Sequence, residues 1–296
     1  MGLFSDATAL MVQAGAKRSA RYGDALYFTG PEFDGREFDE PESWRIPTRH
    51  HAVRCDVYRP PGVARPPIYV HFHGGAFMMR FPRMDDFFAR FMVEEAQVAV
   101  VNVDYDVAPQ HRYPIAHHQA HDVVRWLTQH AGDGDLDGSR IAVGGFSAGG
   151  NLAASVCLQA RDEATPMPKL QVLGVPSLDV STFDKTSTVS DPMIGPAALR
   201  IARTTYFKDE SRRAEPYASP GLSDDLHGLP PAVVLTAEWD LLRAEGDDYA
   251  ERLTASGVDV LHRVVPGRDH YFLDGDRARA RTLLDLIARE TARRLA

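Results

Sequence analysis

The chain has 296 residues, of which 33 are Lys or Arg and 41 are Asp or Glu, so its formal net charge is −8. This acidic balance, with no basic stripe, argues against nucleic acid as a partner. No apolar run approaches the roughly 18 residues of a membrane helix, and no basic segment followed by an apolar core marks a signal peptide. We therefore expect a cytoplasmic monomer or small homo-oligomer, such as a homodimer, that does not bind membranes.

Apolar patterns typical of strands and of helices alternate along most of the chain. We expect strands near 52–58, 68–73, 98–103, 140–145, 170–175, 231–237 and 258–265. We expect helices near 85–96, 115–130, 148–161, 245–256 and 276–294. Strands joined by helical crossovers form a mostly parallel sheet with helices on both faces. The fold class is therefore α/β, and residues 1–296 are expected to form a single domain.

Two segments do not follow this alternation. Residues 1–45 are rich in Phe, Tyr, Gly and acidic residues. Residues 180–215 begin as a Ser/Thr-rich loop that continues into the run from Pro196 to Phe207. We interpret both segments as parts of a helical cap over the ends of the strands, where they would form walls of a substrate pocket.

The most informative local signal is Gly-x-Ser-x-Gly around Ser147, which follows an apolar strand and opens a helix-forming run. This order of strand, motif and helix is typical of a nucleophile elbow. Gly145 and Gly149 leave room for so sharp a turn. The turn would expose the Ser147 hydroxyl and aim the first amides of the helix at the reaction centre.

A second glycine-containing turn follows the apolar strand Ile68–Phe72, in the segment His73–Phe77. Adjacent glycines let backbone N–H groups approach a substrate closely. The amides of Gly74, Gly75 and Ala148 are therefore the candidate oxyanion hole for a tetrahedral intermediate.

A nucleophilic serine needs a histidine base, which follows it in the chain in this architecture. His227 lies in a polar turn with no strand before it, and His262 lies in an alternating strand pattern as a solvent-facing residue. Only His270 occupies a loop that leaves a strand and precedes the last helix. We therefore predict His270 as the base.

The carboxylate that orients this base has two candidates at strand ends. Asp240 follows the strand near 231–237, and Asp179 follows the strand near 170–175. Asp269 is adjacent to the base in sequence and is interpreted as a solvated loop charge. Position in the chain leaves the choice between Asp240 and Asp179 open.

Four segments together resemble the signature blocks of the hormone-sensitive-lipase-type carboxylesterases, which are α/β-hydrolases. These segments are His73–Phe77, Asp104–Pro114, Gly145–Ala153 and Ala237–Gly246, and the likeness extends from about residue 50 to the C-terminus, including Pro216–Pro220. The resemblance implies an α/β-hydrolase fold with a cap. It also implies carboxylic ester hydrolysis through Ser147, Asp240 and His270, and thus favours Asp240 as the acid.

The chain departs from the family pattern near the expected pocket. Phe146 replaces a polar residue before the nucleophile, Tyr271 replaces a glycine after the base, and Val175 precedes Pro176 where the family usually has Tyr. We expect His73, Phe77, Phe146 and Tyr271 to contribute to the substrate pocket. The bulky rings predict a narrow site that is specialised for short-chain or otherwise small esters.

Two patterns resemble metal sites only superficially. The run Asp133–Gly138 opens like a calcium loop, but the twelfth position is Gly144 rather than Glu. His117 and His121 have ligand spacing on a helix, yet no third ligand accompanies them. The cysteines, Cys55 and Cys157, are interpreted as small buried apolar residues. We therefore expect no metal and no cofactor.

The predicted function is a serine hydrolase that cleaves a small ester through an acyl-enzyme. One alternative is an amidase or acetyl hydrolase that acts on a specialised natural product with the same triad. A remote alternative is a non-catalytic ligand receptor with a hydrolase fold. Such receptors typically lose a triad residue, whereas this chain keeps all three candidates.

Overall fold

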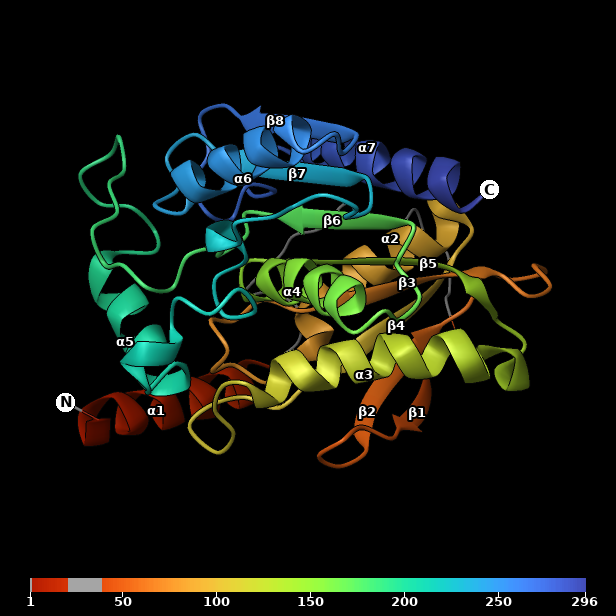
Figure 1. Ribbon diagram of the computed structural model, residues 1–296, viewed down its shortest axis with the longest axis horizontal. Helices are drawn as coiled ribbons and strands as arrows, with labels where there is room; N and C mark the ends of the chain where they lie inside the picture. The colour runs from red at the N-terminus through yellow and green to blue at the C-terminus, as the bar shows by residue number, and fades with distance from the viewer. Residues whose placement is uncertain (1, 21–38) are drawn as a thin grey trace.

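The computed structural model describes residues 2–20 and 39–296. Within these residues, one eight-stranded sheet forms the centre of the molecule (Figure 1). Its strands are β1 (Glu42–Ile46), β2 (Val53–Tyr58), β3 (Pro67–Phe72), β4 (Ala99–Asp104), β5 (Asp137–Phe146), β6 (Leu170–Gly174), β7 (Ala232–Ala237) and β8 (Val260–Val265). They lie in the order β1-β2-β4-β3-β5-β6-β7-β8, antiparallel from β1 to β4 and parallel from β4 to β8.

The helices cover both faces of this sheet. They are α1 (Gly2–Ala20), α2 (Asp86–Ala96), α3 (Ile115–His130), α4 (Ala148–Asp162), α5 (Pro196–Tyr206), α6 (Arg243–Ala255) and α7 (Arg277–Leu295). Buried residues of α3, α4 and α6 form the core on one face, and those of α2 and α7 form the core on the other. Alternate residues of a strand point to opposite faces, so Val70 joins the first core and Tyr69 the second. Parallel strands buried on both faces in this way are typical of α/β proteins.

The predicted fold class is confirmed, and every strand and helix expected from the alternation is present, with ends that differ by up to three residues. The expected cap segment 1–45 needs a correction, because residues 42–45 belong to β1 at one edge of the sheet. Residues 1 and 21–38 of that segment lie outside the described residues. Residues 2–20 form helix α1, which the sequence did not predict.

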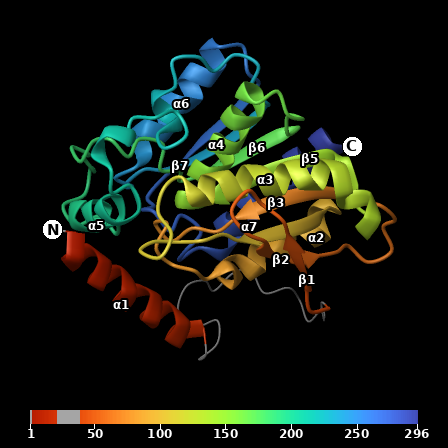
Figure 2. The same cartoon turned by 60° about the horizontal axis from the view of Figure 1, so that its bottom comes forward.

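Helix α1 packs against α5, so the first and the middle parts of the chain lie side by side in both views (Figures 1 and 2). Asp6 of α1 pairs with Arg112 at 2.8 Å, and Gln13 donates a hydrogen bond to the carbonyl of Ala108 at 2.7 Å. These contacts fix α1 to the loop that follows β4. Among the helices of the described residues, none combines the length and apolar character needed to cross a membrane.

Candidate active site

The candidate nucleophile Ser147 lies in the turn between β5 and α4. Its backbone has φ 55° and ψ −115°, in a region that residues other than glycine rarely adopt. A Cβ on Gly145 or Gly149 would overlap the carbonyl oxygen of Phe72 on the adjacent strand β3. The two glycines therefore let the elbow pack directly on the sheet, and the strained serine is held at its carboxyl edge.

The candidate base and acid follow neighbouring parallel strands, so both lie at this same edge. His270 comes after β8 and donates from Nδ1 to Oδ2 of Asp240, which comes after β7, at 2.8 Å. The two residues are only 4% and 2% exposed. The other oxygen of Asp240 accepts a hydrogen bond from the Leu242 amide at 3.0 Å. Both carboxylate oxygens are thus engaged, which fixes the orientation of the imidazole.

The competing carboxylates are engaged elsewhere. Asp179 accepts hydrogen bonds from the amide and hydroxyl of Ser181, at 2.8 and 2.6 Å. Asp269 is half-buried and contacts the backbone of His270 rather than its ring. Its Oδ1 accepts from the His270 amide at 2.7 Å, and its Oδ2 accepts from the Met193 amide at 2.8 Å. Asp269 therefore ties the loop of the candidate base to the segment that precedes α5.

The two other downstream histidines also pair with other carboxylates. His227 is exposed and contacts Asp225 at 2.8 Å. His262 contacts Asp247 at 3.0 Å. Of the three histidines that follow the serine, His270 is the one that lines a cavity together with Ser147.

The residues proposed for the oxyanion hole lie near the serine, because Gly74 and Gly75 line one cavity with it and Ala148 follows it in the chain. Gly75 has φ +110°, and a Cβ there would come within 2.7 Å of the Cβ of Met79. The carbonyl of Gly75 accepts hydrogen bonds from the amides of Met78 and Met79, both at 2.9 Å, which makes the turn rigid. Among the described residues, no acceptor takes a hydrogen bond from the amide of Gly74, Gly75 or Ala148.

Two cavities meet at Ser147. The first cavity has a volume of about 170 Å³. Its wall is formed by Gly74, Gly75, Ala76, Met79, Met84, Asp85, Phe146, Ser147, Val175, Ile194, His270, Tyr271, Phe272 and Leu273. This cavity is mostly apolar, and the candidate base and the glycine turn both contribute to its wall beside the serine.

The second cavity has a volume of about 240 Å³ and lies under the cap segments. Thr8 and Val12 come from α1, and Leu199 and Ala202 come from α5. Its other lining residues are Ala76, Phe77, Met78, Ser147, Ala148, Ser177, Val180, Ile194, Ala198, Ile201, Arg203, Phe207 and Leu242. The two cavities thus share Ala76, Ser147 and Ile194, and only the second has walls from α1 and α5.

Three of the four residues predicted for the pocket line these cavities. Phe146 and Tyr271 contribute to the first cavity, and Phe77 contributes to the second. His73 lines neither of them, because its ring turns into the core and stacks on Tyr105 with centroids 4.3 Å apart. Burial lowers the pKa of the His73 ring, and its Nδ1 contacts the carbonyl of the next residue at 2.7 Å.

Sequence reasoning missed several residues of the cavity walls, among them Ile194 and Asp85. Ile194 lines both cavities, and its signal was an apolar pair, Met193 and Ile194, inside a polar loop. Asp85 lines the first cavity although it is only 1% exposed. In the sequence it opens the helix expected near 85–96, where an acidic residue is ordinary, so nothing distinguished it.

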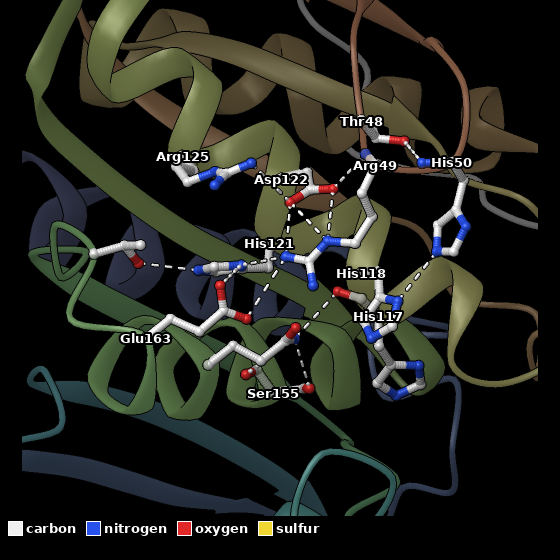
Figure 3. A network of polar contacts seen from close by, with 12 residues as sticks. Thr48, Arg49, His50, His117, His118, His121, Asp122, Arg125, Ser155 and Glu163 are labelled. Atoms are coloured by element: carbon white, nitrogen blue, oxygen red, sulfur yellow. Dashed lines mark hydrogen bonds and ion pairs between the residues drawn. The ribbon is translucent and has the colours of Figure 1, made fainter.

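The histidines of α3 take part in polar contacts between secondary-structure elements (Figure 3). Arg49 binds the carboxylate of Asp122 at 2.8 Å, and His121 contacts Thr165 at 3.0 Å. His50 and His118 stack with ring nitrogens 3.1 Å apart. The described part of the chain contains no group of three or more His, Cys, Asp or Glu residues arranged to hold a metal ion.

His117 connects the nucleophile helix with the cap. Its Nε2 contacts Oδ1 of Asn151 on α4 at 2.9 Å, and its Nδ1 contacts the hydroxyl of Tyr206 on α5 at 3.0 Å. The ring is fully buried, and burial lowers its pKa to about 3. Phe77, which lines the second cavity, stacks on Tyr206 with centroids 4.6 Å apart. His117 therefore lies directly behind one wall of that cavity.

Comparison with known proteins agrees with this architecture. Residues 69–274 match a protein family described as alpha/beta hydrolase fold. The chain is 38% identical to the carboxylic ester hydrolase LipN of Mycobacterium tuberculosis over 77% of its own length and 61% of that protein. It is 31% identical to an arylesterase of Saccharolobus solfataricus over 80% of its own length and 78% of that protein. The solved structure of the metagenomic carboxylesterase EstE1 superposes with a TM-score of 0.87 at 30% identity, covering 97% and 98% of the two chains.

Proposed function

Because the chain belongs to the α/β-hydrolase family and to its carboxylic ester hydrolases, we propose that it cleaves small esters through Ser147, His270 and Asp240. The observation that supports this proposal best is the 2.8 Å hydrogen bond between His270 and Asp240 beside a cavity that Ser147 also lines. A strained serine, a buried imidazole and an orienting carboxylate are the parts that acyl transfer needs.

In the proposed mechanism, the Nδ1–H of His270 is held by Asp240, which leaves Nε2 to take the proton of Ser147. The serine oxygen attacks the ester carbonyl. The amides of Gly74, Gly75 and Ala148 stabilise the negative oxygen of the tetrahedral intermediate. His270 then protonates the leaving alcohol, and water repeats the cycle on the acyl-enzyme.

The two cavities divide the substrate between them. His270 must protonate the leaving alcohol and lines the first cavity but not the second. We therefore assign the alcohol half of the ester to the first cavity. The acyl chain then enters the second cavity, whose walls come from α1 and α5. In this proposal the cap consists of α1 and residues 180–215, and it limits the length of the acyl chain.

A series of p-nitrophenyl esters of increasing acyl length tests the proposal. Each buried methylene adds roughly 0.8 kcal/mol of binding until the wall is reached, after which further length strains the site. We expect the highest kcat/KM between acetyl and about hexanoyl esters and no activation at a lipid–water interface. Rates that keep rising with long-chain emulsified esters would show that the second cavity is open and that the enzyme is a lipase.

A further inference from the structure

A buried carboxylate–imidazole pair lies beside the candidate active site and has no role in the mechanism above. His71 on β3 is 0% exposed, and Asp85 is 1% exposed. Nε2 of His71 and Oδ2 of Asp85 are 2.8 Å apart. The ring of His71 is enclosed by Phe88 and Phe146, with centroids 5.0 and 5.5 Å away.

The second oxygen of Asp85, Oδ1, has no donor among the described residues, and Asp85 belongs to the wall of the first cavity. Oδ1 is also not among the buried polar atoms that lack both solvent exposure and a hydrogen-bond partner. It therefore retains some accessible surface. Asp85 lines the first cavity together with Ser147 and His270, and we infer that this small surface adjoins that space. The carboxylate does not cap the N-terminus of α2 either.

The hydrogen-bond pattern indicates where the negative charge lies. Nδ1 of His71 is buried and has no partner. A protonated ring would leave a charged N–H unpaired in the core, which costs far more than an unpaired lone pair. A neutral ring donates from Nε2 to Asp85, and an ionised Asp85 then carries the charge of the pair. The pair thus presents one negative charge to an otherwise mostly apolar cavity.

We propose that Asp85 determines specificity by selecting esters whose alcohol half carries a hydrogen-bond donor, either a hydroxyl or a protonated amine. This inference rests on the proposed function, because it needs the alcohol half to occupy the first cavity. A carboxylate oxygen without a donor in an apolar site is unfavourable, and a donor on the substrate completes its hydrogen bonding. An alkyl alcohol of the same shape leaves the carboxylate unpaired and is disfavoured.

Two pairs of acetate esters of matched shape test this inference. The hydroxyl pair is 2-hydroxyethyl acetate and propyl acetate, and the amine pair is 2-(dimethylamino)ethyl acetate and 3-methylbutyl acetate. Acid release is followed in a pH-stat at pH 7, with spontaneous hydrolysis subtracted. We expect kcat/KM to be about ten- to a hundredfold higher for the donor ester of at least one pair, since hydrogen bonds to charged groups have this strength. The pair that responds identifies the donor.

Two variants assign the preference to Asp85. Asp85→Asn keeps an oxygen that accepts from His71 but removes the charge. The ratio of kcat/KM within the amine pair is therefore expected to fall about tenfold. The ratio within the hydroxyl pair is expected to fall less. Asp86→Asn is the matched control, because Asp86 lies outside the cavity wall and binds Tyr58 and Arg90 at 2.7 and 2.6 Å. The control variant is expected to keep both wild-type ratios.

The ratios of kcat/KM within each pair distinguish a failure of this inference from a folding defect. Total activity distinguishes it from a failure of the proposed function. A folding defect lowers both members of a pair equally and leaves their ratio intact. Ratios near one in the wild type, or ratios that Asp85→Asn leaves unchanged, overturn the inference. Methyl 3-hydroxybutanoate and methyl 3-methylbutanoate carry the same difference on the acyl half. A preference for the first of these esters, with no preference within either alcohol pair, also overturns the inference. Absence of all Ser147-dependent ester hydrolysis refutes the proposed function instead.

Discussion

The two cavities that meet at Ser147 differ in how the chain builds them. The first is made mainly of turns that directly follow strands β3, β5, β6 and β8, together with the short helix η2 (Pro82–Asp85). The second is formed by α1, α5 and the loop before α5, segments far apart in the sequence, which pack over residues that follow strands β3, β5, β6 and β7. In the proposed function, the chemistry therefore depends on positions that the sheet fixes, and substrate size depends on the helices that pack over the sheet.

The two regions are nevertheless joined. Ile194 contributes to both cavities, and Asp269 links the loop of the candidate base to Met193 by a 2.8 Å hydrogen bond. On the other side, His117 links Asn151 of the nucleophile helix to Tyr206 of the cap helix. Changes on the sheet side should alter the rate of the chemistry, and changes on the cap side should alter substrate length and stability.

The largest effect is expected for Ser147, which lines both cavities. Ser147→Ala removes the nucleophile and should lower kcat by about 10⁴- to 10⁶-fold. Circular dichroism and thermal unfolding should stay close to the wild type, because the substitution deletes one oxygen. Substantial esterase activity in this variant would exclude Ser147 as the nucleophile.

The next effect separates the two candidate acids on the sheet side. Asp240→Asn should reduce kcat by up to about 10⁴-fold, since the imidazole loses the partner that fixes its tautomer. Asp179→Asn is the matched control and should change kcat only slightly, because Asp179 binds Ser181 rather than the base. Steady-state kinetics with one p-nitrophenyl ester decide the order. The reverse ranking would assign the acid to Asp179.

A smaller effect is expected on the cap side. Leu199 is 8% exposed and lines the second cavity. Leu199→Ala should enlarge that cavity and raise the ratio of octanoyl to butanoyl ester hydrolysis several-fold. Leu222→Ala is the control, because Leu222 is 41% exposed and lines neither cavity. An unchanged ratio in Leu199→Ala would place the acyl chain outside the second cavity.

The smallest effect concerns the link between the regions. Burial lowers the pKa of His117 to about 3, below its ordinary value of 6.5, so the folded protein binds this proton more weakly than the unfolded chain. Above pH 6.5 this ring is neutral in both states and does not lower the free energy of unfolding. As the pH falls from 6.5 towards 3, the free energy of unfolding decreases by roughly 1 kcal/mol per pH unit.

Thermal unfolding between pH 7 and 4 measures this loss. The fall in Tm should be shallower in His117→Gln than in the wild type. His227→Gln serves as the control, because the side chain of His227 is 76% exposed. An equally steep fall in all three proteins would mean that other groups cause the loss of stability.

The same contrast explains how much the sequence predicted. The elbow, the glycine turn and the loop of His270 each follow a strand within a few residues, so local patterns were enough to find them. The parallel sheet then brings the ends of its strands to one edge, which placed Asp240 and His270 close together. These positions follow from patterns of residues close together in the sequence and from one rule, that parallel strands end at the same edge of a sheet.

The cap and the buried pair depend on contacts that local patterns do not encode. Helix α1 lacks a strong apolar stripe and is held by α5 and by pairs such as Asp6 with Arg112. Strand β1 is a five-residue edge strand in which only Ile46 is buried. His71 on β3 and His73 just after this strand are two positions apart, yet Asp85 binds His71 and Tyr105 covers His73. Such partners become visible only when the chain is folded.

The most direct test of the account is to locate the covalent adduct of an organophosphonate by mass spectrometry. We predict one adduct per chain on the oxygen of Ser147, formed in proportion to the loss of esterase activity and absent from Ser147→Ala. An active enzyme that forms no adduct, or an adduct on another residue that accompanies inactivation, would contradict the assignment of Ser147 as the nucleophile at the junction of the two cavities.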